Sequence, residues 1–440
     1  MRELAERWLP LAGRGDFVLS PAGLWLALAA LSAGARGDTA AELRRLLGVD
    51  AADAARAVAW TAATLDATDA LRHATRIWSR VPLEQAYAEA LPGVGSAPMD
   101  AAAVDAWVRE VTHGMVERLP LRVTDETLLV LVDALVLTAR WAEPFPGAAT
   151  RPRDFTAGDG TVRAVPTMHR GFPAGQAWAA PGGVRVLDLP CAPAEPGCPP
   201  ARVRFALGPP DAPPADVLAA TWAPPAARTP IEADRVAVAL PRLALRTTRD
   251  ATDDVASLGA PTVLTEAADL GGLSPVPLAL SQVVQESVVR VAEQGVEAAA
   301  VTALATRFGA PPPPPSVWNP SPSTGPSASR CSTVRACCPC SPHGSQVCPR
   351  IREPLARVTS PEARREVPGP PGPWPWTGAV RGRSPAARRS RRAGAGGGAQ
   401  HNPGAGFTVL LCGAGGAGPA GGGRADRTVS GGRGDGAWRT

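Results

Sequence analysis

A run of five prolines, Pro311–Pro315, divides this chain of 440 residues into two parts of different character. Before the run, apolar residues recur at the spacings typical of helices and strands. After it come Ser/Pro-rich, Cys-rich, Arg-rich and Gly-rich stretches, in which only Phe407–Cys412 (FTVLLC) has the pattern of a strand. Such composition cannot bury enough apolar surface to offset the entropy of ordering the chain. We therefore expect one folded domain in residues 1–310 and a low-complexity, disordered or out-of-frame tail in residues 311–440.

The first helices of the domain are predicted from the signals at their ends. Residues 17–19 are expected to form a short strand that leads into a helix, with Ser20 as its N-cap and Pro21 at its first position. Thr39 and Glu42 have the spacing of a capping box for a second helix, which the following glycine at position 48 is expected to end.

The strands are predicted from apolar runs. Leu128–Thr138 (LLVLVDALVLT) is almost unbroken, which is typical of a strand covered on both faces. Val236–Leu240 and Leu280–Val291 are expected to be further strands. Helices followed by many strands indicate the α+β class, with large mixed sheets.

Charge is divided between the two parts of the chain. The formal net charge of the whole is +5. Residues 311–440 hold 17 Arg and five acidic residues, a net of +12, so residues 1–310 carry −7 (5 − 12). The stretch Arg381–Arg392 would suit nucleic acid, but it has no interleaved aromatic side chains, so nucleic-acid binding is a remote alternative.

Cysteine spacing does not predict a metal site. Six of the eight cysteines lie in the tail, and they lack the paired C-x-x-C knuckles of a zinc site. Cys191 and Cys198 of the domain could form one disulfide, although nothing requires it. We expect no cofactor.

No apolar run reaches the roughly 18 residues of a membrane span, and the first residues lack the pattern of a secretory signal. On this basis the chain is expected to be cytoplasmic, unless its true start lies upstream, and to have no membrane partner.

Several segments, in order, resemble the serpin superfamily of serine protease inhibitors. They are Phe17–Pro21 with Leu31–Leu43 (L-x-x-G-A-x-G-x-T-x-x-E-L), Asp105–Val116 (W-V-x-x-x-T-x-G), Leu131–Phe145 (L-V-N-A…W-x-x-P-F), Phe155–Met168 (F-x-x-x-x-G…V-P-x-M) and Glu293–Thr302 (E-x-G-x-E-A-A-A-x-T). The resemblance implies a serpin-like fold of bacterial type with an exposed reactive loop. It also implies a monomer that tends to act in the extracellular space.

The resemblance further implies a suicide inhibitor rather than an enzyme. A target serine protease would cleave the loop and form a covalent acyl complex, and the freed loop would insert into the main sheet as a new strand before the ester is hydrolysed. A non-inhibitory or inactive serpin remnant is the alternative within the family. A hydrolase is the alternative from another class, but no G-x-S-x-G precedes the histidines of the domain, which are His73, His113 and His169.

The hinge of the loop follows from the family motif. Its residues are Glu293, Gly295, Val296, Glu297, Ala298, Ala299, Ala300, Val301 and Thr302. In an inserted strand, the face with Val296, Ala298, Ala300 and Thr302 would carry nothing larger than Val, and the charge of Glu297 would lie on the other, outward face. An ordinary Ala-rich helix over Glu297–Ala305 is the alternative reading of this segment.

The position of the scissile bond follows from family spacing. The candidates are Arg307, Phe308, Gly309 and Ala310. Arg307 would suit a trypsin-like protease, Phe308 a chymotrypsin-like one and Gly309 an elastase-like one, and we favour Phe308 or Gly309.

Four residues fall in the region where the central sheet of a serpin opens, namely Ser20, Pro21, Asp133 and Gln285. Asp133 stands where the family usually has Asn, and Gln285 stands where many members have His. These departures leave the fold assignment intact but make the ease of loop insertion an open question.

The serpin segment that follows the loop, [VI]-[DN]-R-P-F-x-F, is absent. Codons for residues 316–330 read two bases later permit Glu and then P-I-T-I-D-R-P-F-G-F, and the C-rich codons of Pro311–Pro315 are a natural slip site. We therefore hypothesise a frameshift after the loop. The missing strands would bury roughly ten large side chains at about 2 kcal/mol each, so the literal chain is expected to fold incompletely.

Overall fold

The computed structural model describes all residues of the chain except 69, 158–160, 194–195, 197, 311–406 and 413–440. The described residues belong to one compact unit. The disorder expected for the tail concerns residues that lie outside the described part of the chain. The short strand predicted at Phe407–Cys412 is described and is confirmed.

The α-helices are α1 (Arg2–Trp8), α2 (Pro21–Ser32), α3 (Gly37–Leu47), α4 (Ala51–Asp66), α5 (Gln85–Ala90), α6 (Ala101–Val111), α7 (Pro214–Ala219) and α8 (Thr252–Ser257). The strands are β1 (Leu71–Ser79), β2 (Val94–Pro98), β3 (Leu129–Trp141), β4 (Arg151–Thr156), β5 (Val162–Pro173), β6 (Ala177–Ala180), β7 (Val184–Ala192), β8 (Arg202–Leu207), β9 (Thr229–Pro230), β10 (Arg235–Pro241), β11 (Leu243–Asp250), β12 (Leu278–Ala292), β13 (Gly295–Phe308) and β14 (Phe407–Cys412). None of the helices in this part of the chain is long and apolar enough to cross a membrane.

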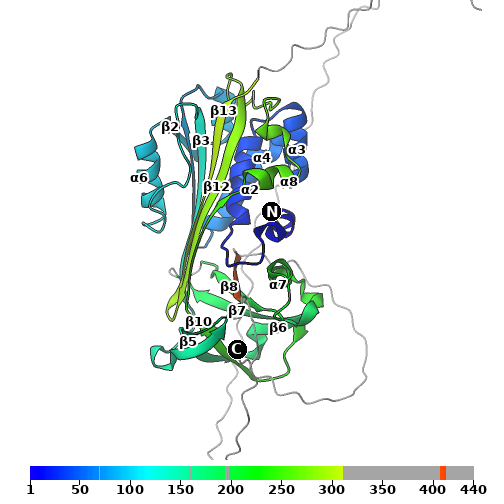
Figure 1. Cartoon of the computed structure of the whole chain (residues 1–440), viewed down its shortest axis with the longest axis vertical. Coiled ribbons are helices and arrows are strands. Elements are labelled where there is room, and N and C mark those ends of the chain that lie inside the picture. The colour runs from blue at the N-terminus through cyan, green and yellow to red at the C-terminus, as the bar shows by residue number, and fades with distance from the viewer. Residues whose placement is uncertain (69, 158–160, 194–195, 197, 311–406, 413–440) are drawn as a thin grey trace, which may run out of the picture. The chain divides into compact units, whose positions relative to one another are not determined.

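The large sheet has the strand order β11-β12-β13-β3-β1-β2, and all neighbours are antiparallel except β1 and β2 (Figure 1). At its end β3 also pairs with β7, which belongs to a second sheet with the order β9-β6-β7-β8-β14. A smaller sheet has the order β10-β5-β4. The α+β class and the strands predicted at residues 128–138, 236–240 and 280–291 are confirmed.

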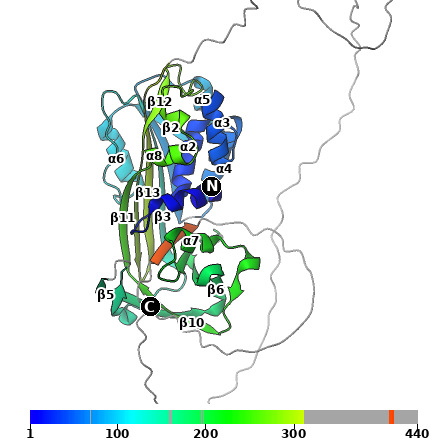
Figure 2. The ribbon, with the colours of Figure 1, turned by 45° about the vertical axis from the view of Figure 1, so that its right-hand side comes forward.

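The large sheet is covered on both faces, which explains the unbroken apolar pattern of β3. Leu129 and Leu131 pack in the cluster that includes α2, whereas Val130 and Val132 pack in the cluster that includes α6. Figure 2 shows α2, α3, α4 and α8 on one face of this sheet and α6 on the other. Helix α2 is apolar on all sides, and nearly all its residues are accordingly buried.

Two local predictions at the start of the domain have different outcomes. Ser20 caps α2 as predicted, since its Oγ accepts the Gly23 N–H at 3.1 Å. Residues 17–19 do not form a strand. A side chain, rather than a neighbouring strand, accepts a backbone hydrogen bond here, since the Val18 N–H donates to Thr247 Oγ1 at 2.9 Å.

The capping box predicted for α3 is wrong. The helix begins at Gly37, before Thr39. Thr39 Oγ1 accepts the N–H of Asp269, and the Glu42 carboxylate accepts hydrogen bonds from Thr262, so both side chains are used in contacts with distant residues. The glycine at position 48 does end α3, with a left-handed φ of 72°.

The disulfide considered between Cys191 and Cys198 does not form, because both are free thiols.

Candidate functional site

The predicted hinge lies in a strand at the centre of the large sheet. β13 pairs with β12 on one side and with β3 on the other, so its backbone groups are bonded on both edges. The expectation of an exposed loop is therefore corrected for residues 295–308, and the helix alternative for residues 297–305 is excluded. The physical reason is that insertion joins the facing edges of β12 and β3 through one strand and removes its apolar side chains from water.

Side chains of β13 alternate between two cores, whereas the sequence predicts one buried and one outward face. Val296 and Ala298 belong to the cluster around Trp141. The side chains facing the opposite core, which includes α6, are Ala299, Val301, Ala303 and Ala305. Glu297 is exposed and lies 3.8 Å from Arg290 on β12. Small neutral residues thus let both faces of the strand be covered without burying a charge.

Gly295 begins β13 where the chain turns from β12 against β3. A Cβ at this position would lie 2.0 Å from the carbonyl oxygen of Ala139. No side chain fits there, so the inserted strand requires glycine at this point.

A cluster of polar contacts holds Glu293 at the turn before β13. The Glu293 carboxylate accepts hydrogen bonds from Arg242 Nη2 at 2.6 Å, from Arg242 Nε at 2.9 Å and from Thr150 Oγ1 at 2.6 Å. Its backbone carbonyl accepts the N–H of Phe145 at 2.9 Å. Burial alone would raise the pKa of Glu293, but the hydrogen bonds from Arg242 and Thr150 outweigh it and lower the pKa. These contacts fix the start of the inserted segment.

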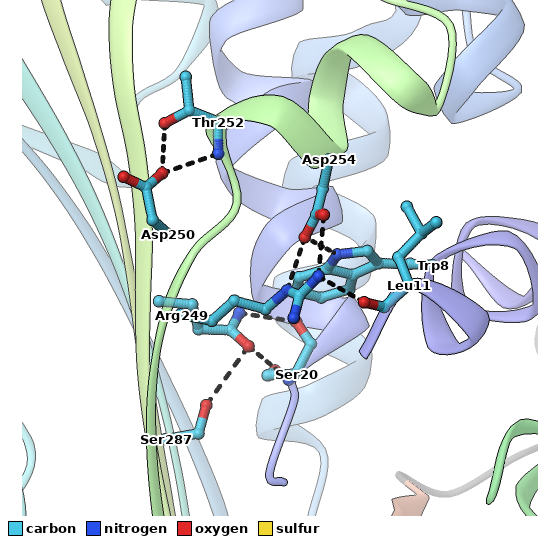
Figure 3. Close-up of polar contacts among 9 residues, drawn as sticks. Trp8, Leu11, Ser20, Arg249, Asp250, Thr252, Asp254 and Ser287 are labelled. Carbon is cyan, nitrogen blue, oxygen red and sulfur yellow. Dashed lines mark hydrogen bonds and ion pairs between the residues drawn. The ribbon is translucent and has the colours of Figure 1, made fainter. Parts of the chain in front are cut away.

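The amide of Gln285 connects α2, β12 and β13. Its Oε1 accepts the Ser20 N–H at 2.7 Å and the Ser287 hydroxyl at 3.3 Å, and Figure 3 shows Ser20 and Ser287 beside each other. Its Nε2 donates to the Ser20 carbonyl at 3.0 Å and to Thr302 Oγ1 at 2.8 Å. Gln285 therefore contacts both the cap of α2, next to Pro21, and the inserted strand.

Asp133 occupies the other side of the inserted strand. Asp133 and Gln285 are the partners of Thr302 across β3 and β12. Asp133 is fully buried, and its Oδ1 accepts the His73 Nε2–H at 2.6 Å and the Thr75 hydroxyl at 2.9 Å. Ser20, Asp133 and Gln285 are thus gathered around Thr302, and Pro21 follows Ser20 as the first residue of α2.

His73 is a site residue that sequence reasoning missed, because it was considered only as a hydrolase residue. Burial lowers the pKa of His73, but the charge and hydrogen bond of Asp133, with the charge of Asp66, raise it overall. The sequence feature that could have indicated this role is that His73 and Thr75, two residues apart in a strand, point to the same face.

Comparison with known proteins identifies the family. The family described as "Serpin (serine protease inhibitor)" matches residues 2–319. This chain is a serpin. Serpins are protease inhibitors rather than enzymes, as the sequence indicated.

The relatives of this serpin include animal and plant proteins. The leukocyte elastase inhibitor of Bos taurus is 29% identical over 328 residues, which cover 67% of this chain and 84% of that protein. Serpin-Z2A of Oryza sativa subsp. japonica is 34% identical over 175 residues, or 35% of this chain and 41% of that protein.

Solved serpin structures share the fold. "Cleaved Serpin 42Da" matches with a TM-score of 0.61 and 23% identity, over 70% of this chain and 90% of that chain. The structure of "a Thermophilic Serpin, Tengpin, in the Latent State" matches with a TM-score of 0.59 and 17% identity, over 70% of this chain and 97% of that chain. At these identities the two likenesses concern the fold alone.

The scissile-bond candidates of this serpin lie together at the end of β13. Arg307 and Phe308 are the last residues of the strand, and Phe308 is 64% exposed. The Gly309 N–H donates to the Pro277 carbonyl, and the Ala310 N–H donates to the carbonyl of Glu266, each at 3.0 Å. All four candidates are thus at the end of the strand opposite to the hinge.

A second group of contacts that sequence reasoning missed ties the N-terminus of the serpin to the large sheet (Figure 3). Arg249, on β11, donates to both carboxylate oxygens of Asp254 and, at 2.8 Å, to the Leu11 carbonyl. The Trp8 indole N–H donates to the same carboxylate at 2.8 Å. Trp8 and Asp254 are 246 residues apart in the chain, so no local pattern indicates this contact.

Proposed function

We propose that this serpin inhibits serine proteases by the suicide-substrate mechanism, with β13 as the inserted segment. One observation carries the proposal: between Gly295 and Thr306 the only charged side chain is Glu297, and it is exposed. The segment therefore fits between β12 and β3 without burying a charge.

The mechanism follows from the length and position of the strand. The serine of the protease attacks a carbonyl within residues 307–310. The peptide bond breaks, the C-terminal piece leaves with a free amino group, and the N-terminal piece stays bound to the serine as an acyl ester. The freed segment then enters the sheet, which makes the hydrogen bonds and apolar contacts that an exposed loop lacks. β13 has 14 residues. At about 3.3 Å per residue, insertion would carry the attached protease on the order of 45 Å along the sheet.

The candidates at the scissile bond define the substrate class of the target. Phe308 favours a chymotrypsin-like protease, Gly309 an elastase-like one and Arg307 a trypsin-like one. A relative with the printed name leukocyte elastase inhibitor agrees with a small or apolar residue at the cut, so we retain Phe308 and Gly309 as the preferred positions.

The proposal is tested by incubating the full chain with chymotrypsin, elastase and trypsin in separate reactions. We expect a stoichiometric, SDS-stable complex with one of the first two proteases, at a mass equal to the protease plus 45.1 kDa less the released C-terminal piece. Phe308→Ala should abolish the complex with chymotrypsin, and Arg307→Ala is the matched control. Cleavage without any complex contradicts the inhibitory function of the chain with its present residues 311–440.

An inactive or non-inhibitory serpin is the second candidate function. It is favoured by the position of β13 in this uncut chain, because a segment already in the sheet cannot gain stability by inserting. Thermal unfolding before and after cleavage within residues 307–310 separates the two. An inhibitor gains heat resistance on cleavage, whereas an inactive form does not.

We also propose that residues 311–440 are out of frame and that the functional domain is residues 1–310 completed by the missing strands. The family match ends at residue 319, shortly after the proline run, which supports this view. The nucleotide sequence covering residues 305–330 tests it. A coding sequence whose other frames cannot encode the serpin segment contradicts the proposal.

A further inference from the structure

His73 and Asp133 form a buried polar pair beside the inserted strand. Asp133 Oδ1 accepts two hydrogen bonds, but its Oδ2 has no hydrogen-bond partner among the described residues. A buried carboxylate with one unpaired oxygen is costly unless a positive charge lies next to it. The ring of His73, whose side chain is 7% exposed, is the group placed to supply that charge.

The first turn of α2 lies next to the Asp133 carboxylate. A Cβ built on Gly23 in this turn would lie 3.4 Å from Asp133 Oδ2. The N-terminal end of a helix carries partial positive charge, which stabilises a nearby carboxylate. This end of α2 therefore adds to the positive charge that the His73 ring can place next to the Asp133 carboxylate.

The other groups around the ring leave Asp133 as its main charged partner. Asp66, at the end of α4, accepts the backbone N–H of His73 at 3.1 Å and adds a second negative charge. The residues that α2 and β13 place beside Asp133 are neutral, namely Gly23 and Thr302, and the neutral Gln285 of β12 lies on the other side of Thr302. A pocket of about 510 Å³ borders His73, and the charged or titratable side chains that also line it are Asp66, Arg72, Glu110 and His113.

The inserted strand changes the surroundings of this pair. With β13 in place, Thr302 lies opposite Asp133 and the carboxylate is fully buried. Without β13, the edge of β3 beside Asp133 would lose this cover, and water could stabilise the charge. Insertion therefore makes an uncompensated carboxylate more costly than before.

We infer that His73 is a positioning residue for strand insertion, because it holds a proton that neutralises Asp133 when β13 covers that carboxylate. The inference rests on the proposed insertion of β13, but not on the capture of a protease. The direction of the pH dependence follows from the raised pKa of His73 in the folded chain with β13 in place. The stability that the proton on His73 gives to the folded chain with β13 in place is fully present below the ordinary pKa of histidine and is lost as the pH rises through the raised value. Each pKa unit between the folded and the unfolded state corresponds to about a tenfold change in the folding equilibrium.

The test uses the full chain cut within residues 307–310, so that no target protease is needed. Urea unfolding is measured between about pH 5.5 and 9 for the wild type, His73→Gln, Asp133→Asn and His113→Gln. His113 is the matched control, because it borders the same pocket but is exposed. We expect the folding equilibrium of the wild type and of His113→Gln to shift toward the unfolded state as the pH rises through the raised pKa of His73, and the other two variants to lack this step.

A wild-type profile in either His73→Gln or Asp133→Asn overturns the inference. If His73→Gln does not fold, the inference is tested by Asp133→Asn and by an NMR titration of the His73 ring in the wild type. A pKa of His73 at or below about 6.5 in that titration overturns the inference. A chain that shows the pH step but traps no protease keeps this inference and contradicts the inhibitory function. Trapping without the pH step contradicts this inference alone.

Discussion

Val296 and Glu297 are adjacent in the chain but face opposite sides of the large sheet. Val296 is 1% exposed and packs in the cluster around Trp141, whereas the Glu297 side chain is 54% exposed. The two positions therefore separate the effect of a charge inside the sheet from the effect of a charge on its surface.

Val296→Arg should block insertion, because it places an unpaired charge in the core at a cost of several kcal/mol. The variant is expected to be cleaved by the target protease as an ordinary substrate, without an SDS-stable complex. Glu297→Arg is the matched control and should cost at most about 1 kcal/mol, from its exposed contact with Arg290. Equal trapping by the two variants would show that residue 296 does not enter the sheet.

Gly295→Ala should weaken the inserted state selectively, because its Cβ would collide with the carbonyl oxygen of Ala139. We expect the cleaved variant to unfold at a lower temperature than the cleaved wild type by an amount equivalent to about 1–3 kcal/mol. Gly175→Ala is the matched control, because a Cβ there meets nothing within 4 Å. Thermal unfolding followed by circular dichroism measures both, and an unchanged midpoint for Gly295→Ala would contradict the close approach.

Glu293→Gln should destabilise the chain near neutral pH by about 1–3 kcal/mol, because it removes the charge that Arg242 and Thr150 bind. The pKa of Glu293 is lowered in the folded state from an ordinary value of 4.5. Its contribution is therefore present above that value and is lost as the pH falls through the lowered one. Urea unfolding at a series of pH values should show the wild type and the variant converging in acid.

The control for this prediction is Glu117→Gln, which changes an exposed glutamate. It should leave stability and its pH profile unchanged. A constant difference between wild type and Glu293→Gln down to about pH 2 would mean that the ionised carboxylate is not the stabilising group.

Gln285→Leu should destabilise the inserted form, because the Ser20 backbone N–H and carbonyl and the Thr302 hydroxyl would lose a partner. Leaving buried polar groups unpaired costs about 1–3 kcal/mol each. Gln282→Leu, at a half-buried position of the same strand, is the control. Urea midpoints of the two variants measure the difference, and equal midpoints would rule out the role of this amide.

Local pattern was enough to predict the elements that carry the site. The apolar run of β3, the strands β10 and β12, and the cap of α2 at Ser20 all follow from residues close together in the chain. The hinge motif also indicated which face of the inserted strand tolerates a charge, because side chains of any strand alternate with a period of two.

The polar contacts of the site could not be predicted in the same way. Thr39 and Glu42 have the spacing of a capping box, yet they bind Asp269 and Thr262, which are more than 200 residues away. His73 and Asp133 are separated by 60 residues, and their contact exists only because β1 and β3 pair in one register.

The amino-acid sequence by itself therefore determined the fold class, the main strands and the small, largely neutral character of the segment between Gly295 and Thr306. Only the tertiary structure decided that this segment is a strand between β12 and β3 and that a buried carboxylate lies opposite Thr302. The physical reason is that a strand pattern describes one chain segment, whereas its position depends on which edges and cores elsewhere in the fold it can complete.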